Sequence, residues 1–356
     1  MFETELILWL QSFSAEWLTA VMRVLTPIGD PRTFVALAII VTFGYDFQKG
    51  FILFQVVVWN GALTNFLKNM VALPRPAAVD AAVELLGSDT TNATPFVAAD
   101  GNDFFDLPEA EAIAHYRTTP DVSYGFPSTH VSASTSFGLT SAVLVRSSRV
   151  AVVALTYVLV VAFSRLYLGR HFLADVLGGF VVGALVLAGI GFLVKTHAAK
   201  LVLQMRSVPA AWRTPQKAVL TALLTVPPLL LLALGAESDF TSVGRLLAAN
   251  AAFGILFLRG MPAERPTIGS RLARVVLALV LFVGSTALME ICATHAGLAN
   301  SDWGDFTIGF VPPFAYLLGT VHIGSALGFY WKRNIAAHYY PQCVTFRTAA
   351  AVGREG

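Results

Sequence analysis

The chain has 356 residues, of which 56% are hydrophobic and only 13% are charged, and its formal net charge is +2. Ordinary soluble domains carry about 25% charged residues, so this composition nearly excludes a soluble globular enzyme and also excludes a disordered chain. The balanced charge gives no sign of a nucleic-acid partner. The composition instead predicts a polytopic membrane protein, whose partner is the lipid bilayer.

The first predicted element is an amphipathic helix within residues 1–30. Its polar side chains recur at helical spacing and therefore share one face of the helix. These side chains are Glu5, Ser12, Glu16, Thr19 and Arg23. A helix that lies in the membrane interface is the simplest interpretation, and a spanning helix with this face turned inward is the alternative.

Nine further apolar segments predict membrane spans, or ten spans if the N-terminal helix also crosses. They lie near residues 33–47, 50–70, 129–147, 150–167, 171–195, 216–235, 243–259, 272–291 and 305–330. The predicted fold class is therefore all-α, a polytopic transmembrane helix bundle. We expect a transmembrane core at residues 31–200, additional C-terminal transmembrane helices at 201–335 and a cytoplasmic tail at 336–356.

Basic residues are distributed unevenly over the connections between these spans. Alternate connections hold sixteen of the 24 Lys and Arg residues, and such enrichment marks the cytoplasmic side of a membrane protein. The sixteen are Lys49, Arg146, Arg149, Lys195, Lys200, Arg206, Arg213, Lys217, Arg259, Arg265, Arg271, Arg274, Lys332, Arg333, Arg347 and Arg354. The other side, predicted to face the periplasm, lumen or exterior, carries a long acidic loop at residues 77–126. This loop is either a lid over a site or a solvated spacer.

Three clusters of polar residues stand at the ends of predicted spans, within residues 68–76, 124–130 and 164–175. By the predicted topology all three clusters lie at the same, non-cytoplasmic face. They contain three cations, Lys68, Arg75 and Arg165, at or near lipid depth. A cation costs ~2.5–3.5 kcal/mol at the bilayer centre and less near its edge, so three together predict an anionic partner. Snorkelling toward lipid headgroups is the alternative for any one of them.

A phosphoryl group fits these cations, because it carries about −1.5 to −2 charge and offers three acceptor oxygens. Ser128 and Thr129 open a predicted helix after a proline, and the free amides of a helix start also favour an anion. A plain N-cap is the alternative for this pair. His130 then lies on the first turn, beside the predicted anion.

His171 and Asp175 are four residues apart and therefore share one helical face. A carboxylate behind an imidazole fixes its tautomer, although a purely structural pair has the same spacing. These parts predict covalent catalysis, in which His171 attacks phosphorus and His130 first protonates the leaving alkoxide and then activates water. No cofactor is expected. No metal is expected either, because no carboxylate cluster stands in the sequence to bind one.

The three clusters resemble the signature of the type 2 phosphatidic acid phosphatase superfamily. Residues 68–76 match K-x6-R-P, residues 127–130 match P-S-x-H, and residues 164–175 match S-R-x5-H-x3-D. The resemblance covers about residues 33–195, with Thr129 where Gly is commoner. It implies that His171 is the nucleophile, Asp175 its partner and His130 the acid and base. It further implies phosphate ligands, which are Lys68, Arg75, Ser128, Thr129 and Arg165.

The wording of the motifs, LPRP, YGFPSTH and SRLYLGRH, is similar to the sphingosine-1-phosphate phosphatase branch. We therefore expect an integral membrane phosphatase that hydrolyses a lipid phosphate monoester, of the sphingoid-base phosphate or phosphatidic acid type. The alternatives are a polyprenyl pyrophosphate phosphatase and a sugar-phosphate phosphatase like glucose-6-phosphatase. A non-enzymatic transporter or receptor is disfavoured, because the His171–Asp175 pair is intact.

Overall fold

The computed structural model describes residues 2–86, 106–119, 122–193, 214–233, 239–259, 264–298 and 301–330. Within these ranges all regular elements are helices, and the one strand-like contact is an isolated bridge between Glu264 and Tyr330. The prediction of an all-α fold is therefore confirmed for the described part. The helices are α1 (Glu5–Ser12), α2 (Glu16–Ile28), α3 (Pro31–Gly44), α4 (Phe47–Val71), α5 (Pro76–Val79), α6 (Ala110–Thr118), α7 (Thr129–Val145), α8 (Ser148–Tyr167), α9 (Leu173–Leu193), α11 (Thr214–Ala233), α12 (Phe240–Arg259), α13 (Ile268–His295) and α14 (Asp302–Ala326).

Side-chain caps explain where several helices begin. Asp30 accepts a hydrogen bond from the amide of Arg32, with Pro31 in the first turn of α3. Asp46 accepts one from the amide of Lys49 at 2.9 Å and so opens α4. These caps satisfy amides that have no partner within the helix. Proline is tolerated in the first turn because an amide hydrogen there would have no helical acceptor.

The predicted count of nine spans is not confirmed. In the described ranges six helices are long and apolar enough to cross a membrane, or seven if the bent pair α2 and α3, which meet at 53°, forms one span. A span needs ~20 residues, whereas α3 has 14 and α7 has 17. In α11 the part of the helix whose side chains the structure describes includes the shorter apolar stretch Leu224–Ala233. The six apolar helices indicate a multi-pass membrane protein.

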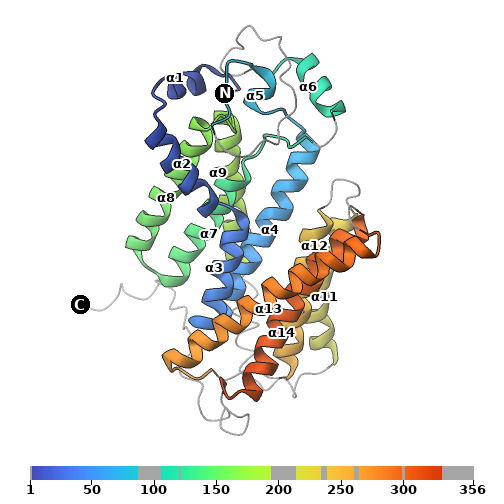
Figure 1. Ribbon diagram of the computed structural model, residues 1–356. Helices are drawn as coiled ribbons and strands as arrows, with labels where there is room; N and C mark the ends of the chain where they lie inside the picture. The colour runs from blue at the N-terminus through green and yellow to red at the C-terminus, as the bar shows by residue number, and fades with distance from the viewer. Residues whose placement is uncertain are drawn as a thin grey trace, which may run out of the picture.

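The N-terminal segment is not the single helix that the sequence predicts. The chain breaks between Ser12 and Glu16, so α1 and α2 are separate. Thr19, expected on the polar face, is buried and shares a hydrogen bond with the Tyr167 hydroxyl at 2.8 Å. The polar face is thus discontinuous, because one of its members packs inward. Figure 1 shows α1, α5 and α6 gathered at one end of the bundle, called here the upper end, and α2 descending from it.

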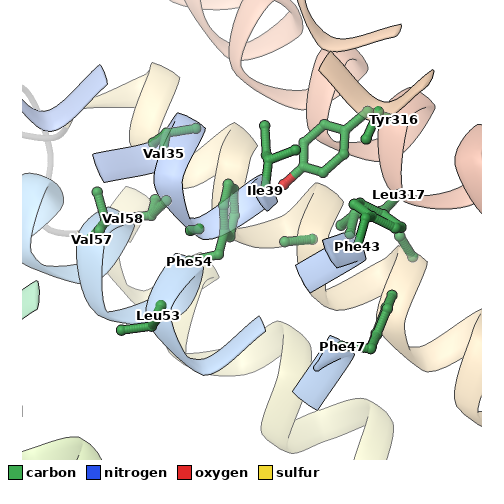
Figure 2. Close-up of a cluster of buried hydrophobic side chains, with 14 of the residues drawn as sticks. Val35, Ile39, Phe43, Phe47, Leu53, Phe54, Val57, Val58, Tyr316 and Leu317 are labelled. Carbon is green, nitrogen blue, oxygen red and sulfur yellow. The ribbon is translucent and has the colours of Figure 1, made fainter. Parts of the chain in front are cut away.

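The largest hydrophobic cluster joins α3 and α4 to the C-terminal helices. Figure 2 shows the ring of Tyr316, from α14, beside Ile39 and Phe43 of α3. The ring centroid of Tyr316 lies 6.2 Å from those of both Phe43 and Phe54. Burial of such side chains, at ~25 cal/mol per Å² of apolar surface, holds the C-terminal helices against the core.

The contact between α7 and α9 depends on glycine. An added Cβ at Gly183 would lie 2.6 Å from the carbonyl oxygen of Ser132, and one at Gly179 would lie 2.8 Å from that of Ser128. No Cβ is tolerated at such distances, so only glycine allows this approach of the two helices. The close contact sets α7 directly against the upper part of α9.

Polar side chains link α4, α12 and α11 below this level. Pro228 in α11 has no amide hydrogen, so the carbonyl of Leu224 lacks its usual helical donor. The side-chain Nδ2 of Asn250 donates to this carbonyl at 2.7 Å, and its side-chain oxygen accepts from Gln55 Nε2 at 2.7 Å. Asn250 therefore compensates for the proline while it joins three helices.

Arg274 lies fully buried at the lower end of the bundle. Its guanidinium donates to the carbonyls of Phe43, Arg265 and Phe329, and it is 3.1 Å from the carboxylate of Glu264. The sequence counts Arg274 among the loop cations, but it is a buried cross-link because its donors are satisfied by protein groups. The predicted tail at 336–356 and the loop residues 87–105 and 120–121 lie outside the described residues.

Candidate active site

All eight residues predicted for the site lie near the upper end of the bundle (Figure 1), where α4 ends, α7 begins and α8 turns into α9. Backbone hydrogen bonds join the three clusters. The amide of Ser128 donates to the carbonyl of Asp175 at 2.9 Å, and that of Gly125 donates to the carbonyl of Leu73 at 2.9 Å. Gly125 is required there, because an added Cβ would lie 2.9 Å from Asp175 Oδ2. The fold thus assembles what the sequence keeps about a hundred residues apart.

His171 and Asp175 form a buried pair. Nδ1 of His171 is 3.2 Å from Asp175 Oδ2, and the same oxygen accepts from the amide of Phe172 at 2.9 Å. The two side chains are 2% and 0% exposed. This arrangement orients the imidazole so that Nε2, the nitrogen not engaged by Asp175, is the one that can react.

The environment keeps His171 uncharged at neutral pH. Burial lowers the pKa of His171 well below its ordinary value, and the positive charges of Arg75, Arg165 and Lys68 act in the same direction. A neutral imidazole retains a lone pair on Nε2. The ring is therefore in the protonation state that a nucleophile needs.

His130 lies on the first turn of α7, within the same group of charges. Arg165, Lys68, Arg75 and Arg170 are all close enough to act on it electrostatically. His130 in turn acts on His171. The two histidines therefore face one strongly positive region, which favours an anion between them.

Ser128 stands at the N-cap position of α7, yet its side chain makes no cap hydrogen bond. The hydroxyl is fully buried and has no hydrogen-bond partner among the described residues. By contrast, Ser147 and Thr267 do cap α8 and α13. An uncapped, buried hydroxyl beside cations and free helix amides is available to a ligand. Thr129 begins the helix, and its carbonyl accepts from Ser132 Oγ at 3.1 Å.

Arg75 and Lys68, two of the predicted phosphate ligands, donate hydrogen bonds to residues that precede α7. Arg75 donates from Nε to the carbonyl of Ser123 at 2.7 Å and from Nη2 to its hydroxyl at 2.8 Å. Lys68 Nζ donates to the carbonyl of Tyr124 at 2.7 Å. Residues 122–125, called the strap, thus engage both cations. Main-chain carbonyls therefore solvate these cations in addition to any anion that they bind, and the predicted anionic partner stays a prediction.

Helix α6 supports the strap. The Tyr116 hydroxyl donates to the carbonyl of Ser123 at 3.0 Å, and burial raises the pKa of Tyr116, which keeps that hydroxyl protonated. Arg117 donates to the last carbonyls of α4, those of Val71 at 2.9 Å and Ala72 at 3.2 Å. The described part of the acidic loop therefore lies against the site residues rather than apart from them.

Sequence reasoning gave no role to Arg170. Its side chain is only 2% exposed, like that of Arg165, and it lies next to His171 in the chain. Its position between Gly169 and the predicted nucleophile was a usable signal. No sequence signal predicts the strap contacts, because main-chain carbonyls, which any residue carries, are the acceptors.

A buried polar cluster lies beneath the site, between α4 and α7. Thr64 Oγ1 is 3.1 Å from Ser132 Oγ, and the side-chain amide of Asn60 contacts the same hydroxyl at 3.0 Å. All three side chains are 0% exposed. These bonds tie the helix that carries Lys68 to the helix that carries His130. Among the described residues no group of three or more His, Cys, Asp or Glu is placed to hold a metal ion.

A paired histidine and aspartate, a second histidine and converging cations are groups suited to binding and transferring a phosphoryl group. Residues 49–198 match the family model of the PAP2 superfamily. Members of the PAP2 superfamily are phosphatases. The PAP2 match extends from α4 through α9, and all eight predicted site residues lie within it. No curated protein and no solved structure matches the chain.

The PAP2 match agrees with the superfamily predicted from the three motifs. It does not distinguish one branch of the superfamily from another, so the sphingosine-1-phosphate phosphatase branch stays a prediction. Helices α12 to α14 lie outside the PAP2 match. A hydrogen bond links them to α4, because Asp239, before α12, accepts from Asn65 Nδ2 at 2.6 Å.

Proposed function

We propose that this protein is a membrane phosphatase that hydrolyses a lipid phosphate monoester, of the sphingoid-base phosphate or phosphatidic acid type, through a phosphohistidine intermediate. The observation that carries the proposal is the neutral, buried His171, held by Asp175 at 3.2 Å within a cluster of cations. A nucleophile, an orienting carboxylate and a positive cradle in one place are suited to phosphoryl transfer.

In the first step the lone pair of His171 Nε2 forms a bond to phosphorus, and the bond from phosphorus to the lipid oxygen breaks. The departing alkoxide takes a proton from His130 and leaves as an alcohol. A bound phosphate dianion supplies the counter-charge that lets His130 carry this proton. Asp175 stabilises the positive charge that develops on the imidazole of His171.

In the second step His130 takes a proton from water as the water oxygen attacks phosphorus. The bond between nitrogen and phosphorus breaks, and inorganic phosphate leaves while His171 regains its lone pair. In both steps Arg165, Arg75, Lys68 and the Ser128 hydroxyl stabilise the equatorial oxygens. These groups supply the charge that a metal supplies in other phosphatases, and we propose metal-independent turnover.

A lipid substrate suits a site at the end of a membrane bundle. Its tail can stay in the bilayer while its phosphate reaches the cations, and each buried methylene contributes ~0.8 kcal/mol to that partition. The apolar run at residues 51–59 of α4 does not form a binding surface for the lipid tail. Phe54, Val57 and Val58 pack in the core of the bundle rather than around the site.

A lipid diphosphate is the second candidate. Arg170 favours it, because this buried residue adds a fourth cation close to His130, and a second phosphoryl group adds negative charge to the ligand. A polyprenyl pyrophosphate is the substrate of this type that we weigh against a lipid monophosphate. A sugar phosphate is the remaining alternative.

Phosphate release by detergent-solubilised protein in EDTA tests the proposal. The panel contains a sphingoid-base phosphate, phosphatidic acid, a polyprenyl pyrophosphate and glucose-6-phosphate. We expect hydrolysis of the lipid monophosphates, its loss in His171→Ala, and wild-type turnover in His295→Ala, which changes an exposed histidine on α13. Normal turnover in His171→Ala would contradict the mechanism. Activity that requires added magnesium would contradict metal independence, and efficient hydrolysis of glucose-6-phosphate alone would contradict the lipid substrate.

We also propose that the site faces away from the cytosol, since sixteen of 24 basic residues are predicted on the opposite connections. Thr118, exposed at the end of α6, provides the test. A single cysteine at this position, in a chain with Cys292 and Cys343 replaced by serine, should react with an impermeant reagent from outside. Reaction only after the cytosolic face is opened would invert the topology.

A further inference from the structure

The first two helices carry an exposed apolar face that the proposed chemistry does not use. On α2, Trp17, Val21, Val24 and Ile28 recur at helical spacing and are 70%, 43%, 68% and 42% exposed. Trp9 on α1 and Phe13, the residue that caps its C-terminus, are also exposed, and their rings meet edge to face with centroids 5.1 Å apart. These six side chains are called the N-terminal apolar face.

Other side chains of the same helices are bound to the end of α8, which leads into the turn that carries His171. Gln11 Nε2 donates to the carbonyl of Tyr167 at 3.1 Å and to that of Glu84 at 2.7 Å. The amide of Glu84 returns a hydrogen bond to Gln11 Oε1 at 3.1 Å. With the Thr19 contact to the Tyr167 hydroxyl, these bonds fix α1 and α2 to the end of α8, four residues before His171.

Aromatic contacts continue this attachment around the site. The ring of Phe2 lies 5.5 Å from that of Phe172 and 6.4 Å from that of Phe126, measured between centroids. Phe172 follows His171, and Phe126 stands two residues before Ser128. The N-terminal segment therefore touches both halves of the candidate active site through Phe2, while Trp9, Phe13 and Trp17 are exposed.

The chemistry of the N-terminal apolar face fits the boundary of a lipid bilayer. Trp and Phe side chains are favoured there, since an indole has an apolar body and a polar N–H. The neighbouring helix is also suited to lipid, because α2 packs on α8, a candidate span whose Val152, Leu155 and Leu159 are exposed. Figure 1 shows α1 at the upper end, beside the top of the bundle.

We propose that the N-terminal apolar face inserts into the leaflet at the upper end of the bundle and delivers the tailed substrate to the adjoining site. This inference rests on the proposed lipid phosphatase activity and deepens it. The face holds the rim of the site at the depth of the lipid phosphates, so that a substrate can reach His171 without leaving the membrane. A substrate without a tail gains nothing from it.

Two substrates separate this role from catalysis itself. The variant Trp9→Ala/Phe13→Ala/Trp17→Ala is compared with wild type on a long-chain lipid phosphate in phosphatidylcholine vesicles and on soluble p-nitrophenyl phosphate. We expect kcat/KM for the vesicle substrate to fall at least about tenfold, the equivalent of ~1.4 kcal/mol, with no change for the soluble substrate. The matched control Leu272→Ala/Val276→Ala/Val280→Ala truncates three exposed apolar residues of α13 and should change neither.

Equal losses on both substrates, or no loss on either, would overturn the inference. If the wild type failed to hydrolyse p-nitrophenyl phosphate and the lipid phosphate, the proposed function would fail instead. A second measurement does not depend on turnover. In vesicles of brominated lipid, quenching of tryptophan fluorescence should decrease in the conservative variant Trp9→Phe/Trp17→Phe. Unchanged quenching, or a change from oligomer to monomer in the triple variant with vesicle kinetics intact, would assign this face to a protein partner.

Discussion

The guanidinium of Arg75 donates hydrogen bonds to the strap and, in the proposed mechanism, binds the substrate phosphate at the same time. Two of its five N–H donors bind the carbonyl and hydroxyl of Ser123 at 2.7 and 2.8 Å. The substitution Arg75→Lys keeps the charge but replaces a planar fork with one ammonium nitrogen. A single nitrogen cannot hold Ser123 and also contact a phosphate in the geometry of the fork.

The expected effect follows from the loss of one charge-assisted hydrogen bond. Such a bond contributes ~1.5–3 kcal/mol, and each 1.36 kcal/mol is a factor of ten. We therefore expect kcat/KM for the lipid phosphate to fall roughly 10- to 150-fold in Arg75→Lys. Ser123→Ala removes only a neutral partner, worth ~0.5–1.5 kcal/mol, and should reduce kcat/KM by less than about tenfold.

Steady-state phosphate release in detergent measures both changes. The matched control is Arg149→Lys, which alters an exposed arginine in the first turn of α8, at the lower end of the bundle. If Arg75→Lys were as active as Arg149→Lys, the bidentate role of Arg75 would be refuted. If Ser123→Ala were more harmful than Arg75→Lys, the strap rather than the fork would be the essential part.

Two further predictions concern stability. Because the pKa of His171 is lowered in the folded protein, the unfolded chain binds a proton that the folded chain does not, and stability is lost as pH falls below about 6.5. Below that pH the unfolding free energy of wild type should fall faster than that of His171→Asn, by up to ~1.4 kcal/mol per pH unit; parallel curves would contradict the shift. Asn250→Leu should lower the unfolding free energy in detergent by ~1–3 kcal/mol, because the Leu224 carbonyl and Gln55 both lose a partner. Adding Pro228→Ala to Asn250→Leu restores an amide hydrogen for the Leu224 carbonyl and should recover part of that loss. If this double variant were no more stable than Asn250→Leu, Asn250 would not be compensating for Pro228.

The sequence predicts the assembly of the site better than its surroundings. Side-chain spacing is enough to pair His171 with Asp175 and to set Ser128 at the start of α7, because both follow from local helix geometry. The strap cannot be predicted in this way, since Ser123 and Tyr124 act largely through their main-chain carbonyls. Three-dimensional proximity, not composition, makes them partners of Lys68 and Arg75.

The count of nine spans, which is not confirmed, rests on hydropathy alone. Hydropathy treats α7 as an ordinary span, but residues such as Ser132, Ser134 and Thr135 are buried inside the bundle and reduce its apolar surface. The break between α1 and α2 is likewise invisible in the pattern of polar residues. It follows from tertiary contacts, because Gln11 and Thr19 each bind Tyr167 from a different helix.

The glycine contact between α7 and α9 fixes the spacing of the site, and the residues that make this contact are not the residues that would touch a substrate. Ser132 and Gly183 lie below the phosphate cradle, yet their separation fixes how far the helix bearing His130 stands from the helix that begins beside His171. A single methyl group at Gly183 must move one helix relative to the other. Sequence change is therefore poorly tolerated at these positions below the site, which have no chemistry of their own. The strap and α1, by contrast, are joined to the site by hydrogen bonds that can re-form.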